Sequence, residues 1–131
     1  MIGLDTNVLV RYLTQDEPVQ AGRASTLIEN ACTRRAPGWI ALVVLCELVW
    51  VLRGAYRYDK ALVLAVLEQL LATAELQVEN EHVAALALSS YREGAADFAD
   101  YVILHGGMTG GCDIVYSFDR KLVAEATVRE P

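Results

Sequence analysis

The sequence predicts an α/β domain built around a parallel sheet. Short apolar runs with the composition of strands alternate with longer segments whose apolar residues recur at helical spacing. Such an alternation is typical of a parallel sheet whose strands are connected by helices. The chain has 131 residues, 54% of them hydrophobic, and contains no repeat or low-complexity linker. We therefore expect one domain spanning residues 1–131.

The first half of the chain carries recognisable helix starts. Pro18 stands near the first turn of a helix, where its missing N–H is not needed, and Asp59 is placed to cap another. Residues 42–53 are apolar on every side, which is typical of a buried helix. The expected strands are 1–5, 36–41 and 75–79, and the expected helices are 6–14, 16–35, 42–53 and 59–73.

The second half alternates in the same way. Gly94 closes one predicted helix, and the following helix ends among the glycines of residues 106–111. The expected strands are 112–118 and, at an edge, 127–130, and the expected helices are 81–94, 97–111 and 119–126.

Composition excludes several classes of protein. The net charge of −6 argues against a simple nucleic-acid-binding module, which is usually basic. No apolar run approaches the roughly 20 residues of a membrane span, and the start MIGLDTN lacks the features of a signal peptide. We therefore expect a cytoplasmic protein without a membrane partner. Cys32, Cys46 and Cys112 have neither zinc nor C-x-x-C spacing and are expected to be buried free thiols.

Two carboxylates follow predicted strands. Asp5 ends the first strand, and Asp119 follows the strand 112–118. Ligands of open α/β sheets collect beyond the carboxyl ends of the strands, so both side chains are expected at the same edge. Each acid could instead simply cap the helix that follows it.

Two further acids share one predicted helix. Asp97 opens the helix and is placed to cap it, whereas Asp100 lies inside the run DFADYVIL. Because apolar residues flank Asp100, its carboxylate could face a cleft, although a solvated position is also open.

Glu47 is the only carboxylate in the apolar stretch WIALVVLCELVWVLRG. A buried carboxylate without a partner is costly. An ion pair with Arg53 or Arg57 would offset that cost. The alternative is that Glu47 points into the same cleft as Asp5 and Asp100, where a metal ion supplies the counter-charge.

Acids that converge on one cavity repel one another unless a cation joins them. Oxygen ligands without His or Cys favour Mg²⁺ or Mn²⁺ over zinc. Neither His82 nor His105 belongs to a Ser/His/Asp spacing. The chemistry that remains is metal-assisted hydrolysis by a metal-bound water.

Four motifs, LDTNVLVRYL, ELVWVL, DFADYVIL and SFDRKL, occur in this order from Ile2 to about Leu122. Together they resemble the PIN-domain ribonucleases and, within them, the VapC-type toxins of bacterial toxin–antitoxin pairs. The resemblance implies a three-layer α/β/α sandwich with a short central parallel sheet. It also implies a Mg²⁺- or Mn²⁺-dependent endoribonuclease, a small antitoxin partner and a homodimer.

The resemblance also assigns roles to residues. It implies a metal-binding catalytic set of Asp5, Glu47, Asp100 and Asp119, with the accessory residues Asp97, Thr6, Asn7 and Ser117. RNA needs positive charge near such a cleft, and the candidates are Arg11, Arg53, Arg57 and Arg120, together with Arg92 and Lys121.

Three alternatives stand beside the nuclease. An aspartyl-phosphate phosphatase needs D-x-D after the first strand, but Asn7 occupies the place of the second Asp. A phosphate-accepting receiver domain needs a pair of adjacent acids at the end of the first strand, and Asp5 has no acidic neighbour there. A PIN-like module that only binds RNA or protein is the third alternative, and the complete set of four acids disfavours it.

Overall fold

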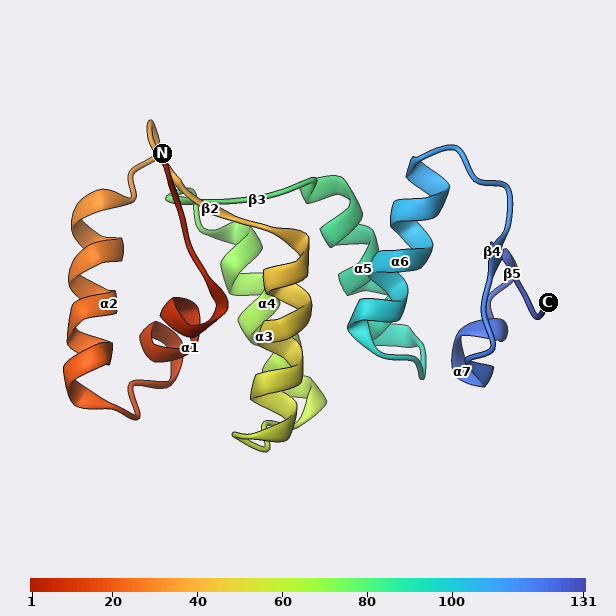
Figure 1. Ribbon diagram of the computed structural model, residues 1–131, viewed down its shortest axis with the longest axis horizontal. Coiled ribbons are helices and arrows are strands. Elements are labelled where there is room, and N and C mark those ends of the chain that lie inside the picture. The colour runs from red at the N-terminus through yellow and green to blue at the C-terminus, as the bar shows by residue number, and fades with distance from the viewer. The chain divides into compact units, whose positions relative to one another are not determined.

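Helices make up most of the chain, and the strands between them are only two or three residues long. The computed structural model describes all residues from Met1 to Pro131, and Figure 1 follows them by colour. The chain divides into two compact units, Met1–Glu79 and Asn80–Pro131. Each unit has its own sheet.

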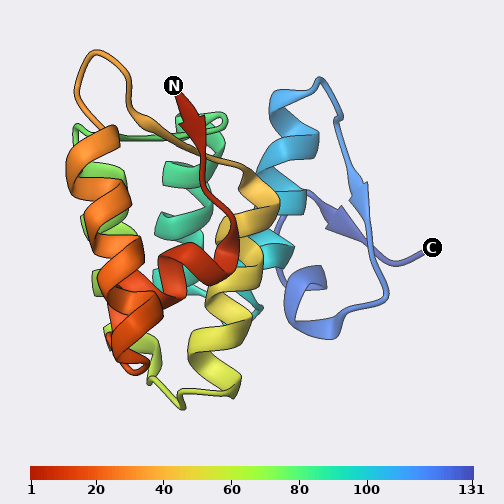
Figure 2. The ribbon, with the colours of Figure 1, turned by 60° about the vertical axis from the view of Figure 1, so that its left-hand side comes forward.

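The first unit carries a three-stranded parallel sheet in the order β1-β2-β3. Ile2 pairs with Gly38, and Gly38 pairs in turn with Leu76. Helix α1 contacts both α2 and α3, and Figure 2 shows β1 leading directly into α1. The elements are β1 (Ile2–Gly3), α1 (Thr6–Thr14), α2 (Pro18–Ala31), β2 (Gly38–Ile40), α3 (Leu42–Gly54), α4 (Lys60–Ala72) and β3 (Leu76–Val78).

The predicted helix starts of this unit are confirmed. Pro18 is the first residue of α2, and the Asp59 carboxylate accepts a hydrogen bond of 2.9 Å from the backbone N–H of Leu62. The cap satisfies one of the N–H groups that a helix N-terminus leaves without an internal partner.

Helix α3 differs from the prediction of a helix buried on every side. Leu48 and Leu52 are fully buried, but Val43 is 62% exposed and Trp50 55% exposed. Glu47 lies between these two on the exposed face, because residues four and three apart share a side of a helix. The expectation of a buried Glu47 was therefore wrong, since an apolar sequence does not reveal which of its faces a neighbour covers.

The second unit packs α5 against α6. The rings of Tyr91 and Phe98 meet edge to face, with centroids 5.9 Å apart, and the Tyr101 hydroxyl accepts a hydrogen bond of 3.2 Å from the N–H of Ala96. A two-stranded parallel sheet, β4-β5, completes the unit. The elements are α5 (Glu81–Glu93), α6 (Phe98–Thr109), β4 (Val115–Tyr116), α7 (Arg120–Val123) and β5 (Val128–Arg129).

One detail of the second unit agrees with expectation and one differs. Helix α6 continues through Gly106 and Gly107 to Thr109, and Gly110 is its C-cap, so the helix ends among the glycines of residues 106–111 as predicted. Cys112 is exposed, whereas Cys32 and Cys46 are buried, so the expectation of three buried thiols holds for two of them. The predicted α/β class with short parallel strands is confirmed. No helix is both long enough and apolar enough to cross a bilayer.

Candidate active site

Asp5 links β1 to α1. Its backbone is extended, and its Oδ1 accepts a hydrogen bond of 2.8 Å from the N–H of Thr6. The helix-cap interpretation is thus correct, but the cap uses only one carboxylate oxygen. Oδ2 has no hydrogen-bond partner. The exposed carboxylate can therefore cap α1 and still offer an oxygen to a cation.

Thr6 brings a second acid to the same place. Its side chain is buried, and its hydroxyl donates a hydrogen bond of 3.1 Å to Oε1 of Glu47, 41 positions further along the chain. Glu47 is not paired with either arginine considered for it, and Arg53 instead donates to the carbonyl of Tyr58 at 3.2 Å. Thr6 therefore contacts Asp5 through its N–H and Glu47 through its hydroxyl.

Asp97 and Asp100 open helix α6 in the second unit. The backbone N–H of Asp97 donates to Oδ2 of Asp100 at 3.0 Å, and the backbone N–H of Asp100 donates to the carbonyl of Asp97 at 3.0 Å. Asp97 is the N-cap residue of the helix, as expected. The side chain of Asp97 is exposed and that of Asp100 is half-buried.

Asp119 is the N-cap of α7. Its Oδ1 accepts hydrogen bonds from the N–H groups of Lys121 (2.9 Å) and Leu122 (3.1 Å). The hydroxyl of Ser117 accepts a 3.0 Å hydrogen bond from the backbone N–H of Asp119. Ser117 therefore holds the backbone that carries this acid, while its accessory role stays a prediction.

The acids of the second unit affect one another through their charges. Burial raises the pKa of the Asp100 carboxyl, and the negative charges of Asp119 and Asp97 raise it further. The N–H of Asp97 and the charge of Lys121 act in the opposite direction, but the net shift is upward. Asp100 is thus a carboxylate whose negative charge its surroundings disfavour, and a nearby cation would relieve that cost.

The donor chemistry of these residues fits Mg²⁺ or Mn²⁺. Asp5 and Glu47 in the first unit, and Asp100 and Asp119 in the second, offer carboxylate oxygens only, which hard cations prefer. No group of three or more His, Cys, Asp or Glu in the structure is arranged to hold a metal ion. β1 and β4 belong to different sheets, so the expectation that Asp5 and Asp119 follow strands of one sheet and lie at its edge was wrong.

The expected RNA-binding arginines have different surroundings. Arg11 is held by several acceptors: Oε1 of Gln20 (2.7 Å), Oδ1 of Asp16 (3.2 Å) and the Tyr56 hydroxyl (3.1 Å). Arg53 donates to a backbone carbonyl, while Arg57 and Arg120 are exposed. Arg11 is therefore largely committed to contacts within the protein.

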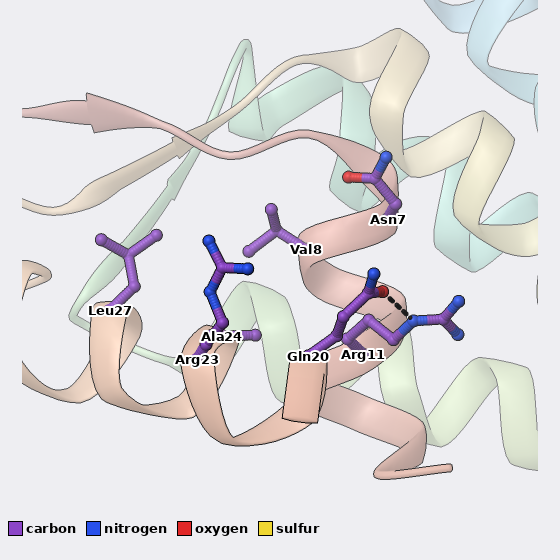
Figure 3. A pocket seen from close by; sticks show the side chains of 7 residues that line it. All are labelled: Asn7, Val8, Arg11, Gln20, Arg23, Ala24 and Leu27. Atoms are coloured by element: carbon purple, nitrogen blue, oxygen red, sulfur yellow. Dashed lines mark hydrogen bonds between the residues drawn. The ribbon is translucent and has the colours of Figure 1, made fainter. Parts of the chain in front are cut away.

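A hollow on the first unit combines Asn7 and Arg11 with residues that the sequence did not single out. It has a volume of about 680 Å³ and lies between α1 and α2. Figure 3 shows its wall, with the Arg23 side chain between Leu27 and Val8. The lining residues are Asn7, Val8, Arg11, Gln20, Arg23, Ala24 and Leu27. Arg23 and Leu27 lie four apart on α2, a spacing that puts them on one face, but the sequence alone does not say which face stays open.

A comparison with family models assigns the class of protein. The model of the PIN domain matches residues 2–126, and the chain therefore belongs to the PIN domain family. PIN domains are generally metal-dependent nucleases. The comparison with curated proteins gives no match.

Proposed function

We propose that this protein is a Mg²⁺- or Mn²⁺-dependent endoribonuclease that hydrolyses RNA phosphodiesters and acts as the toxin of a toxin–antitoxin pair. The observation that carries the proposal is that the PIN match over residues 2–126 contains all four candidate acids. None of the four is neutralised by an ion pair with lysine or arginine. Their charges are therefore available to a cation.

The proposed site takes its ligands from Asp5, Glu47, Asp100 and Asp119. Thr6 orients Glu47 through its hydroxyl, and the α1 cap fixes Asp5 while leaving Oδ2 free. At the start of α6 the carboxylate of Asp100 accepts a hydrogen bond from the N–H of Asp97. At the start of α7 the carboxylate of Asp119 accepts one from the N–H of Lys121. A bound Mg²⁺ or Mn²⁺ supplies Lewis acidity, which activates water and stabilises charge on a phosphoryl oxygen.

We also propose that the whole of residues 1–131 works as one PIN domain, as a homodimer controlled by a small antitoxin protein. The VapC-like order of the four motifs supports this part of the proposal. Co-expression with the gene beside it would test the partner. A protein that co-purifies with the chain and inhibits RNA cleavage is the expected result, and cleavage unaffected by such a protein would contradict the toxin role.

The nuclease itself is tested by replacing single acids. Asp5→Asn and Asp100→Asn should abolish cleavage of RNA in the presence of Mg²⁺ or Mn²⁺, whereas the circular dichroism spectrum stays that of the wild type. Asp113→Asn is the matched control, because Asp113 is exposed and has no hydrogen-bond or ion-pair partner. Full cleavage by either site variant would refute the assignment.

The second candidate function is that of a module that binds RNA or protein without catalysis. It would agree with the finding that no three potential metal ligands are grouped in the structure. Calorimetric titration with Mn²⁺ separates the two functions. The nuclease should bind Mn²⁺ with an affinity that Asp100→Asn weakens, whereas a module that only binds RNA or protein need not bind the ion.

A further inference from the structure

The hollow between α1 and α2 combines an apolar wall with polar groups at its rim. Val8, Ala24 and Leu27 provide the apolar surface, and Leu27 remains 41% exposed. A volume of about 680 Å³ lies in the range of small-molecule sites, roughly 300–1,000 Å³. The hollow can therefore receive a group as large as a nucleotide.

The charge of the hollow is positive. Two arginines and no carboxylate line it, although the chain as a whole carries a net charge of −6. Arg11 already binds Asp16, but Arg23 is exposed and has no hydrogen bond or ion pair. The guanidinium of Arg23 is directed into the hollow between Leu27 and Val8 (Figure 3). Arg23 thus offers an unpaired cation to an anionic ligand.

Two amide side chains can recognise more than charge. Gln20 uses its Oε1 to accept the 2.7 Å hydrogen bond from Arg11, which leaves its NH₂ group to donate. Asn7 is exposed and has no hydrogen-bond partner, so its amide can both donate and accept. Amide groups of this kind bind the edges of unpaired bases.

We propose that this hollow is a nucleotide subsite for the RNA substrate, in which Arg23 contacts a phosphate and the base rests on Val8 and Leu27. The inference depends on the proposed function for the identity of the ligand as RNA. The position of Asn7, two residues after the candidate metal ligand Asp5, places the subsite at the start of the same helix. The lining of the hollow suits a ligand that has a negative charge, an apolar face and hydrogen-bonding edges. A nucleotide has all three, whereas an apolar peptide segment does not.

Binding of a short single-stranded RNA, followed by fluorescence anisotropy in EDTA, tests the role of Arg23. Arg23→Ala should weaken binding several-fold and reduce the slope of log K against log[salt] by about 0.7, the value for one phosphate on a single strand. Arg35→Ala is the control, because Arg35 is also an exposed, unpaired arginine of the first unit but lies outside the hollow. It should leave both quantities nearly unchanged.

The apolar wall has its own matched pair of variants. Leu27→Ala should weaken RNA binding without changing the salt slope, because it removes contact area and no charge. Leu62→Ala is the control, since Leu62 is exposed to a similar extent, 46% against 41%, but lies on α4. The combination of a slope change for Arg23 and none for Leu27 is a result that simple misfolding does not produce.

The outcomes separate this inference from the nuclease proposal. If the wild type binds RNA through Arg23 but cleaves none with Mg²⁺ or Mn²⁺, the subsite stands and the nuclease proposal falls. If Arg23→Ala and Arg35→Ala give the same affinity and slope, the subsite is refuted whether or not RNA is cleaved. Loss of a co-purifying protein from Arg23→Ala, with RNA binding intact, would assign the hollow to a protein partner and also refute it.

Discussion

The hydroxyl of Thr6 donates a hydrogen bond of 3.1 Å to Oε1 of Glu47, and this contact ties the start of α1 to the exposed face of α3. Thr6 is buried, with 8% of its surface exposed. Its N–H is bonded to Asp5 at 2.8 Å, so one buried residue positions two candidate metal ligands. A carboxylate on an exposed helix face would otherwise sample several rotamers.

The first prediction concerns this hydroxyl. Thr6→Val keeps the shape of the side chain but removes the donor to Glu47, so it should weaken Mn²⁺ binding several-fold and lower the rate of RNA cleavage. The free energy of unfolding should fall by only about 1 kcal/mol, the usual net value of one hydrogen bond. Calorimetric titration with Mn²⁺ and urea denaturation measure the two effects.

Thr6→Ser serves as the control for this prediction, because serine restores the hydroxyl. It should recover most of the Mn²⁺ affinity. If valine and serine at this position weaken Mn²⁺ binding equally, the hydrogen bond to Glu47 does not position a metal ligand.

The second prediction concerns the folding stability that is lost when the Asp100 carboxyl group ionises. The pKa of Asp100 is raised above its ordinary value of 3.8, first by burial and then by Asp119 and Asp97. The folded protein therefore binds a proton more tightly than the unfolded chain, and stability falls as the pH rises from 3.8 through the raised pKa. Asp100→Asn removes this cost and should be more stable than the wild type at neutral pH in EDTA, although the proposed function predicts that it is inactive.

Urea denaturation at a series of pH values checks the sign. The stability gained by Asp100→Asn should grow as the pH rises through that window and shrink towards acid. Asp113→Asn is the control for the substitution itself, because the exposed Asp113 side chain has no hydrogen-bond or ion-pair partner. A gain that is the same at every pH would show that the charge of Asp100 is not its cause.

Much of the fold could be predicted from the sequence, because local signals decide it. Pro18 and Asp59 mark helix starts by their own backbone and hydrogen-bonding chemistry, and apolar periodicity marks the helices between them. Strand lengths were overestimated, since residues 112–118 contain only the two-residue strand Val115–Tyr116. An apolar run indicates that its residues are buried. The bounds of the strand depend instead on where hydrogen-bonded pairing with a neighbouring strand begins and ends.

The residues of the candidate site could be proposed from the sequence, whereas their surroundings could not. The four acids could be named because each lies within one of the four motifs, and the caps at Asp5 and Asp119 follow from short-range spacing. The exposure of Glu47 and the open hollow around Arg23 depend on which helix faces remain uncovered. That choice is made by long-range packing, which a single sequence does not display.

The third prediction concerns Asp16, which joins the α1–α2 connection to the end of α3. The Tyr56 hydroxyl donates to Oδ2 of Asp16 at 2.6 Å, and this bond, with those from Thr14 and the charge of Arg11, lowers the pKa of Asp16. A lowered carboxyl pKa contributes stability above 3.8 that is lost as the pH falls through the folded-state pKa.

Tyr56→Phe should therefore raise the pKa of Asp16 towards its ordinary value, and the variant should lose less stability on acidification. Carboxyl-carbon NMR titration measures the pKa directly. Tyr58→Phe is the control, because its ring stacks edge to face with Tyr56 at 6.2 Å but makes no hydrogen bond to Asp16. Equal pKa values in the two variants would contradict the assignment.

The fourth prediction concerns the cysteines. Cys112 is exposed, whereas Cys32 and Cys46 are buried, and burial raises the pKa of both buried thiols. Since the thiolate is the reactive form, Ellman's reagent should modify one thiol rapidly in the native protein and three in denaturant. Cys112→Ser should abolish the rapid reaction, and a rapid reaction that survives this change would show that a buried thiol is accessible.

The final prediction concerns the centre of the first sheet. A Cβ at Gly38 would lie 2.7 Å from Sγ of Cys32 and 2.8 Å from Cδ1 of Leu4, so Gly38→Ala should cost about 1–3 kcal/mol of unfolding free energy through overpacking. Gly22→Ala is the matched control, because a Cβ there meets nothing within 4 Å and Gly22 lies inside α2, where alanine should add roughly 0.5–1 kcal/mol. Urea denaturation of both variants should give changes of opposite sign. A Gly38→Ala protein as stable as the wild type would mean that Cys32 and Leu4 can move aside without cost, and that the contact of β2 with its neighbours is looser than these distances imply.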